Sequence, residues 1–111
     1  MLKNSLEKGN DHWNPFQNGS TIGMKGSERG IIIRDEEHDL GARITLEKID
    51  TGAPYRITSS ICGWMIHTSF FSDEVRAISA YDVMKLELNN MLLEKDEINL
   101  AQKISKFIQE F

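Results

Sequence analysis

Apolar and polar residues alternate along residues 55–71, YRITSSICGWMIHTSFF, and this alternation predicts a β-hairpin. A two-residue turn at Cys62-Gly63 would pair Ile61 with Trp64 and sort the side chains into two faces. The predicted core side consists of Tyr55, Ile57, Ile61, Trp64, Ile66 and Phe70. The predicted outer side consists of Arg56, Thr58, Ser60, Met65, His67 and Ser69. In this register Trp64→Ala is expected to destabilise the protein by about 3–5 kcal/mol, whereas His67→Ala should cost little.

Two further strands precede the hairpin. The first begins with the β-branched run at residues 31–33 and turns polar at Arg34. A loop around Leu40 returns the chain into residues 42–48, where apolar and polar residues alternate again. Turn-forming residues fill the segment 50–54 before the hairpin begins. Three turns therefore join four strands in an antiparallel meander.

A helical period follows the strands. Ser72 is a suitable N-cap, and the acidic residues after it suit the first turn of a helix. The main apolar stripe consists of Ala77, Tyr81, Met84, Leu88, Met91 and Leu92. Val83, Leu86 and Leu93 lie off this stripe, so the helix is expected to bury a second face against the C-terminal segment.

The C-terminal segment predicts an amphipathic helix that Asp96 could cap. Its apolar side consists of Ile98, Ala101, Ile104 and Ile108, with Leu100, Phe107 and Phe111 beside them. No glycine or proline interrupts residues 72–111, which form either one long helix or two, with Asn89-Asn90 or Lys95-Asp96 as the favoured break. The fold predicted is α+β: a four-stranded antiparallel meander sheet followed by two C-terminal helices packed on one face.

Residues 1–29 differ from the rest of the chain. They are rich in glycine, asparagine and serine and show neither a helical nor a strand period. We interpret them as an irregular N-terminal arm, with residues 30–111 as a single α+β domain. Trp13 and Phe16 are the large apolar anchors of this arm. A disordered leader is favoured over an arm that docks these two aromatic residues.

Composition narrows the classes of function. The 111 residues carry a formal net charge of −4, which opposes general binding to nucleic acid. The apolar runs are too short to cross a membrane, and the N-terminus lacks the apolar region of a secretory signal. A single cysteine, Cys62, cannot form an internal disulfide. We therefore expect a cytoplasmic protein that binds neither nucleic acid nor membranes.

The outer face of the predicted sheet is the candidate ligand site. The residues expected to line it are Arg43, Arg56, Thr58, Ser60 and His67. Guanidinium donors and hydroxyl groups together suit an anion or a polar ligand. Arg34, Glu36, Thr45 and Glu47 are expected on the same face. An ordinary solvated strand surface is the simpler interpretation of this composition, and it is the one we favour.

Two other clusters suggest chemistry only at first sight. Residues 35–39, DEEHD, contain potential metal ligands, but strand alternation sends them to opposite faces. A solvated hairpin tip is therefore predicted, with no metal site and no cofactor. Cys62 and His67 are too far apart in the hairpin to act as a nucleophile and its base. The residues indicate no catalytic group, and an enzyme is disfavoured.

Three hypotheses for function remain. The leading one is a noncatalytic protein that self-associates, as a dimer, through either its sheets or its helices. The second is a module that binds another protein, with its acidic helical end facing a basic partner. The third is binding of a small ligand or anion, or an enzymatic activity, on the outer face of the sheet.

Overall fold

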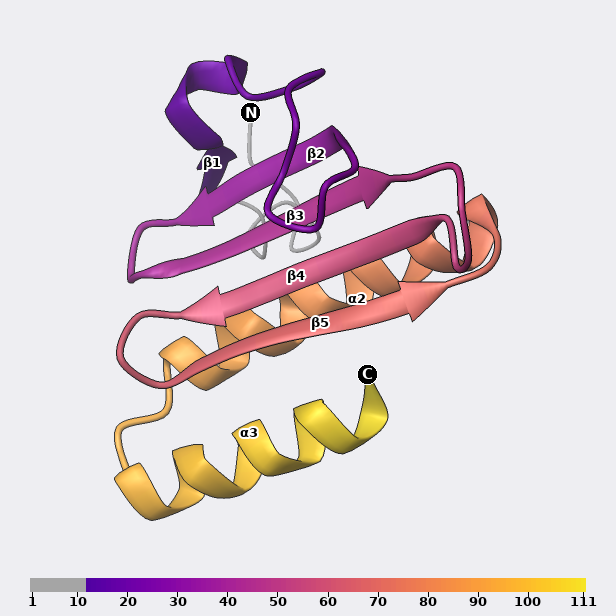
Figure 1. Cartoon of the computed structure of the whole chain (residues 1–111). Helices are drawn as coiled ribbons and strands as arrows, with labels where there is room; N and C mark the ends of the chain where they lie inside the picture. The colour runs from indigo at the N-terminus through magenta and orange to yellow at the C-terminus, as the bar shows by residue number, and fades with distance from the viewer. Residues whose placement is uncertain (1–11) are drawn as a thin grey trace, which may run out of the picture.

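The computed structural model describes residues 12–111, which form one antiparallel sheet and two long helices (Figure 1). The elements in chain order are β1 (Trp13–Pro15), the 3-10 helix η1 (Phe16–Gly19), β2 (Ile31–His38), β3 (Ala42–Lys48), β4 (Tyr55–Ile61), β5 (Met65–Phe71), α2 (Glu74–Leu92) and α3 (Glu97–Glu110). The sheet order is β1-β2-β3-β4-β5. The predicted α+β class and the two C-terminal helices are confirmed, but the sheet has five strands because β1 was not foreseen. Within residues 12–111 no helix is long and apolar enough to cross a membrane.

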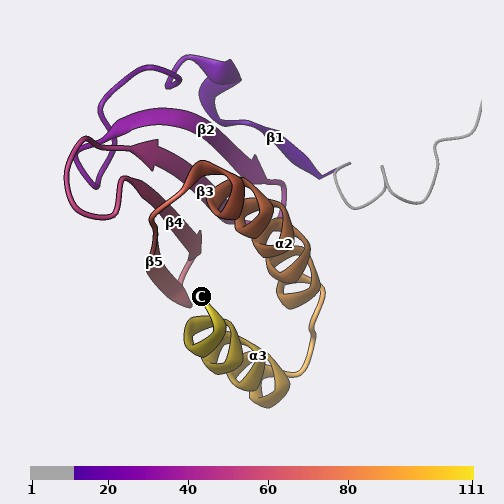
Figure 2. The same ribbon diagram turned by 90° about the vertical axis from the view of Figure 1, so that its right-hand side faces the viewer.

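The two helices lie on the same side of the sheet. α2 crosses the sheet, and α3 lies beside α2 and projects past β5 (Figures 1 and 2). We call the side covered by α2 the helix face and the opposite side the outer face. In β3, Ile44 and Leu46 point to the helix face, while Arg43 and Glu47 point to the outer face.

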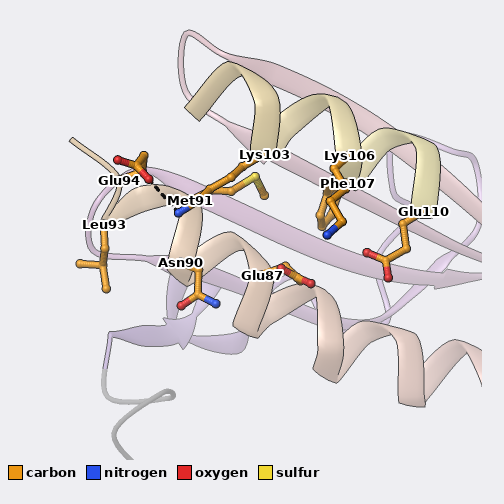
Figure 3. A pocket seen from close by; sticks show the side chains of 9 residues that line it. All are labelled: Glu87, Asn90, Met91, Leu93, Glu94, Lys103, Lys106, Phe107 and Glu110. Carbon is orange, nitrogen blue, oxygen red and sulfur yellow. Dashed lines mark ion pairs between the residues drawn. The ribbon is translucent and has the colours of Figure 1, made fainter. Parts of the chain in front are cut away.

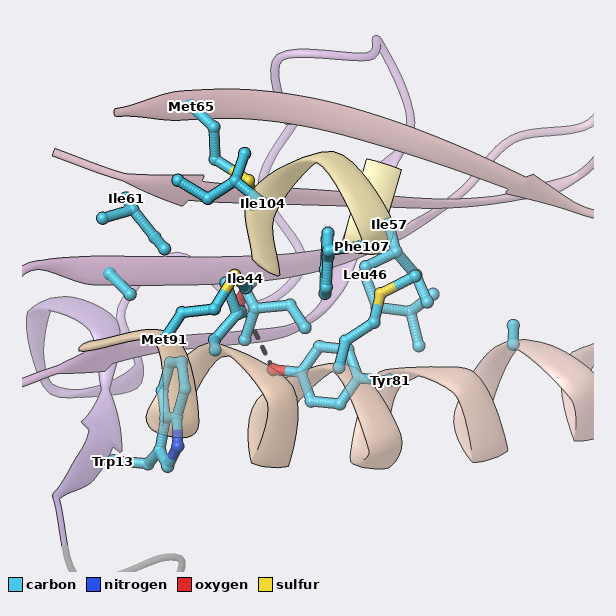
Figure 4. Packing of buried hydrophobic residues seen from close by; sticks show 14 of the residues in the cluster. Trp13, Ile44, Leu46, Ile57, Ile61, Met65, Tyr81, Met91, Ile104 and Phe107 are labelled. Carbon is cyan, nitrogen blue, oxygen red and sulfur yellow. Dashed lines mark hydrogen bonds between the residues drawn. The ribbon is translucent and has the colours of Figure 1, made fainter. Parts of the chain in front are cut away.

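The hydrophobic core lies between the helix face and the helices (Figure 4). Its completely buried apolar side chains are Ile44, Leu46, Ile57, Ala77, Tyr81, Met84 and Leu88. The predicted stripe of α2 therefore faces the sheet, as its period indicated. The Tyr81 hydroxyl donates a hydrogen bond of 3.4 Å to the carbonyl oxygen of Ile44, which ties the helix to β3.

The hairpin of β4 and β5 differs from the predicted register by one residue. Ile61 pairs with Met65, so the turn contains Cys62, Gly63 and Trp64. Gly63 has a φ of 79°, which glycine adopts without strain, and the Trp64 amide donates to the Ile61 carbonyl at 2.9 Å. A shift of one residue moves every side chain of the return strand to the other face.

The return strand consequently has its faces exchanged. The side chains directed to the helix face are Met65, His67, Ser69 and Phe71. Those directed to the outer face are Ile66, Thr68 and Phe70. The prediction that Trp64, Ile66 and Phe70 lie in the core is wrong, since all three are exposed. The placement of Tyr55, Ile57 and Ile61 in the core is confirmed.

A β-bulge in β2 changes the phase of its alternation. The register shifts between Ile32 and Arg34, so Ile32 lies on the outer face opposite Glu47. Arg34 and Glu36 pair with residues that point to the helix face. The prediction that these two charged side chains lie on the outer face is therefore wrong.

The C-terminal residues form two helices. Asp73, not Ser72, caps α2, because its carboxylate accepts a hydrogen bond of 2.8 Å from the Arg76 amide. Asp96 caps α3 as predicted, accepting from the amides of Ile98 and Asn99 at 2.8 and 3.2 Å. The break falls close to the predicted site at Lys95-Asp96.

The helices bury less apolar surface than predicted. Val83 and Leu86 of α2 and Leu93 at its C-cap are exposed, so α3 does not cover the second apolar set. The buried side chains of α3 are Leu100, Ile104 and Phe107. Ile98, Ala101 and Ile108 of the predicted apolar side are exposed, whereas Leu100 and Phe107, expected beside it, are buried. The buried stripe of α3 thus meets the corner between α2 and β5 rather than the outer side of α2 (Figure 2).

The described part of the predicted arm lies against the sheet. Trp13 pairs with His38 through β1 and is buried. The segment after η1 crosses the outer face in front of β2 and β3 (Figure 1). Glu47, fully buried beneath it, accepts hydrogen bonds from the amides of Glu28 and Gly30 at 3.2 and 3.0 Å. The first eleven residues of the arm lie outside the described part of the chain.

Candidate functional site

The predicted ligand residues do not all share one face. Arg43, Arg56, Thr58 and Ser60 lie on the outer faces of β3 and β4, as expected from strand alternation. His67 lies on the helix face, opposite Ser59. Its assignment to the outer group is wrong, because the turn holds three residues instead of two.

Arg43 is engaged within the protein. Its Nε and Nη2 atoms donate to the two carboxylate oxygens of Asp35 at 2.9 and 2.7 Å. Its guanidinium also lies over the ring of Phe16, 3.6 Å from the centroid. The hydrogen bonds from Arg43 to Asp35 are the main reason that the pKa of Arg43 is raised above its usual value. The group therefore stays charged and directed at Asp35.

Asp35 is the centre of this outer-face network. Its carboxylate is buried and accepts additional hydrogen bonds from the hydroxyls of Thr21 and Thr45, at 2.8 and 3.0 Å. A buried carboxylate needs such donors to offset the loss of hydration. The network joins the N-terminal segment to β2 and β3, which is a structural role.

Arg56 is likewise directed at its own chain. Its Nη1 donates to the Glu28 carbonyl oxygen at 3.2 Å, and its guanidinium lies 5.3 Å from the ring centroid of Phe70. Its Nε is buried without a hydrogen-bond partner among the described residues. Neither arginine of the predicted site therefore presents its full set of donors to solvent.

A groove nevertheless borders three of the predicted residues, Arg43, Thr58 and Ser60. It has a volume of about 370 Å³ and lies between the N-terminal segment and the outer face. Thr58, Ser60 and Ile66 line its β4 and β5 side. The Thr58 hydroxyl is 3.3 Å from the hydroxyl of Thr68, so part of the hydroxyl capacity is already used between the strands.

His67 occupies an apolar environment on the helix face. Its ring packs edge-on against Phe107 of α3, with the centroids 6.3 Å apart. Its Nε2 atom and the Oγ atom of Ser69 are both buried and have no hydrogen-bond partner among the described residues. Burial of such groups without a partner costs about 1–3 kcal/mol each. These two polar atoms on one strand are therefore unsatisfied within residues 12–111.

Three exposed apolar side chains lie at or beside β5, and the sequence had placed them in the core. Ile66, Phe70 and Trp64 are 81%, 57% and 44% exposed. We call these three residues the β5 patch. A hollow of about 750 Å³ adjoins it and is lined by the ends of two hairpins, including Gly41, Cys62 and Trp64. The β-branched and aromatic character of this strand was visible in the sequence, but its outward orientation depended on the turn.

The two edge strands of the sheet, β1 and β5, differ in the features that discourage pairing with another chain. β1 is an edge strand of three residues that ends in Pro15, and short length and proline both discourage pairing. β5 has seven residues, MIHTSFF, with no proline and no acidic or basic residue apart from His67. Among residues 12–111, β5 pairs only with β4. Its second edge therefore lacks the charged residues and prolines that usually discourage pairing at a sheet edge.

Another concave site is a pocket between α2 and α3 (Figure 3). It measures about 400 Å³, and both acidic and basic side chains line it. Lys103 pairs with Glu94 at 2.8 Å, and this hydrogen bond lowers the pKa of Glu94 below its usual value. Since Lys103 is directed at Glu94, the side chains of the pocket do not present a single charge that would bind a ligand of the opposite charge.

Residues 35–39 are more buried than a solvated tip would be. Asp35 and His38 are both buried, on opposite faces of the sheet. The His38 Nδ1 atom accepts from the Leu40 amide at 3.0 Å, and its Nε2 atom lies 2.8 Å from the Asn89 side-chain oxygen. No group of three potential metal ligands gathers anywhere in residues 12–111.

Comparison with known proteins adds no further assignment. No protein-family model, no curated protein and no solved structure matches this chain. The function is therefore inferred from the surface of the molecule itself.

Proposed function

We propose that this protein is a noncatalytic module that binds another polypeptide by strand addition at the open edge of β5. Strand addition supplies main-chain hydrogen bonds to the incoming segment, and exposed side chains beside the edge supply specificity. The observation that carries the proposal is the unpaired edge of β5, which has none of the charges or prolines that usually protect such edges.

The β5 patch gives the added strand an apolar surface. Ile66 and Phe70 project from the same side of β5, two positions apart on that face, where they would flank a neighbouring strand. Trp64 lies at the turn and extends the patch along the strand. Exposed apolar side chains grouped in this way mark interaction surfaces more often than scattered ones do.

The geometry favours this function over binding of an anion on the outer face. An anion site would need unpaired guanidinium donors, whereas Arg43 is held by Asp35 and Arg56 is directed at the Glu28 carbonyl. The partner in strand addition is either a second copy of the chain, giving a homodimer, or a different protein. A single exposed cysteine, Cys62, suits a reducing compartment, so the proposal includes a cytoplasmic location.

Peptide selection tests the proposal directly, because random sequences sample many different partner strands. Random ten-residue peptides would be selected on the purified chain, and binding of the recovered peptides would be measured by fluorescence anisotropy. We expect extended, apolar sequences whose affinity falls about tenfold or more, at least 1.4 kcal/mol, in the Ile66→Lys variant. A lysine at this exposed position adds charge to the edge, as natural edge strands do.

The matched control is Leu86→Lys. Leu86 is 54% exposed on α2, so the substitution adds the same charge to a different apolar surface. Peptide binding should be unchanged in this control. Peptides that bind Ile66→Lys as well as the unmodified chain, or that lose affinity only in Leu86→Lys, would show that β5 is not the binding edge.

A further inference from the structure

The β5 strand is self-complementary when it is paired with its own copy in the antiparallel direction. Its seven residues run from Met65 to Phe71, so Thr68 is the central residue. A two-fold axis through Thr68, perpendicular to the sheet, places Thr68 of one copy opposite Thr68 of the other. Each residue before Thr68 then pairs with the residue that lies equally far after Thr68 in the other copy. Each Ile66 then lies opposite Phe70 of the other copy.

We propose that the partner at the β5 edge is a second copy of this chain, joined about this two-fold axis into one continuous antiparallel sheet. The inference rests on the proposed strand addition and identifies the added strand as β5 of the second copy. A two-fold interface of this kind uses the same surface on both subunits, and it closes after two copies. The helices of both copies lie on the same side of the joined sheet.

The outer-face pairs favour this register. Aromatic and β-branched side chains directly opposite each other stabilise neighbouring strands, and the axis at Thr68 creates two such pairs between Ile66 and Phe70. An axis at His67 would instead place two imidazoles opposite each other and leave one strand end unpaired. His67 is the only acidic or basic residue of β5. In the proposed pairing it lies opposite Ser69, so no two like charges face each other.

The helix-face pairs give independent support. In the same register His67 of one copy lies opposite Ser69 of the other. These are the two residues of β5 whose buried polar atoms have no hydrogen-bond partner among the described residues. Side chains directly opposite each other have Cβ atoms about 5 Å apart, a separation that an imidazole and a hydroxyl can bridge. Pairing therefore offers each unsatisfied group a partner.

The position of α3 also suits a sixth strand. α3 projects beyond β5 instead of lying behind the sheet (Figures 1 and 2). One flank of its buried stripe, including Lys103 and Lys106, lines the pocket towards α2. At 100° per residue the opposite flank contains Ala101 and Ile108, and both are exposed in the single chain. An added strand would cover this apolar flank.

Disulfide trapping tests the register. Thr68→Cys would be introduced with Cys62→Ser, which removes the native exposed thiol. Cα atoms of opposite residues in an antiparallel pair are about 4.5–5.5 Å apart, within the span of a disulfide. Mild oxidation should therefore link Thr68→Cys chains into covalent dimers, detected by intact mass under nonreducing conditions.

Ile66→Cys and Phe70→Cys are the matched single-site controls. Each of these residues is separated from its own counterpart by four positions, about 13 Å along the strand, which a disulfide cannot span. We expect about tenfold less covalent dimer from either control than from Thr68→Cys. The double variant Ile66→Cys/Phe70→Cys should again form linked dimers, since its two cysteines face each other across the axis.

Native mass spectrometry provides a second measurement that does not depend on an introduced cysteine. The unmodified chain and Leu86→Lys should be dimers, and Ile66→Lys should be a monomer. Equal trapping at all three single sites, or a monomeric unmodified chain, would overturn the homodimer. If the chain is monomeric but selected peptides still bind in an Ile66-dependent way, strand addition stands and the partner is a different protein.

Discussion

At the scale of single residues, the two tryptophans occupy opposite environments. Trp13 is buried between β2 and α2, with its ring edge-on to His38 at 5.0 Å between centroids. Trp64 lies in an exposed turn. A buried aromatic side chain contributes far more to folding than one that remains largely in water. The tryptophan that stabilises the fold is therefore the one in the N-terminal segment.

Alanine substitutions at the two positions should differ in their effects. Trp13→Ala is expected to lower the free energy of unfolding by about 3–5 kcal/mol, and Trp64→Ala by about 1 kcal/mol or less. Urea denaturation followed by circular dichroism would measure both, at a concentration low enough to keep the chain monomeric. Equal losses, or a larger loss for Trp64→Ala, would contradict the burial of these rings.

At the scale of elements, a row of polar contacts joins β2 to α2. The Glu36 carboxylate accepts from the Tyr81 hydroxyl and from the Lys85 ammonium, both at 2.9 Å. Further along the same strand, His38 meets Asn89. These α2 residues are spaced by four, so they share one side of the helix. The bulge in β2 is what directs their strand partners to the helix face.

The loss of stability caused by Tyr81→Phe should depend on pH, because the Tyr81 hydroxyl makes this contact in its protonated form. Burial, followed by the charge of Glu36, raises the pKa of Tyr81 well above its usual value. Tyrosine in the unfolded chain ionises near pH 10, so the stability that Tyr81 contributes is complete below about pH 10 and is lost as the pH rises above it.

We expect Tyr81→Phe to cost about 1–2 kcal/mol at pH 7 and less at pH 11. Denaturation curves at both pH values, with the unmodified chain as reference, measure the difference. A cost that stays constant between the two pH values would show that the hydroxyl is not held protonated in the folded protein.

Turns and bulges set the limit of what sequence patterns could predict for these elements. The alternation of β3 and β4 and the helical period of α2 each follow from side-chain type, and all three were predicted correctly. The register of β5 depended on whether Trp64 belongs to the turn or the strand, and both choices gave a reasonable pattern. The bulge between Ile32 and Arg34 leaves no compositional signal in a run of three isoleucines.

At the scale of the whole molecule, the outer face is divided in two. The N-terminal segment covers β2 and β3, where it donates hydrogen bonds to Asp35 and Glu47, and it reaches β4 at Arg56, while the outer face of β5 remains exposed at Ile66 and Phe70. Strand alternation correctly grouped Arg43, Arg56, Thr58 and Ser60. Alternation could not show that Arg43 and Arg56 already donate hydrogen bonds within the chain, because their partners Asp35 and Glu28 come from β2 and from an irregular segment. The exposed side of β5 is where the proposed strand addition would take place.

A homodimer through β5 makes thermal stability depend on protein concentration. When unfolding also separates the subunits, mass action favours the folded dimer at higher concentration. The melting temperature of the unmodified chain should rise by about 3 °C for each tenfold increase in concentration. Ile66→Lys should melt at a temperature independent of concentration, because its added charge opposes pairing, whereas Leu86→Lys should behave like the unmodified chain. Scanning calorimetry across a hundredfold range of concentration measures all three, and a flat response from the unmodified chain would argue against coupled folding and pairing.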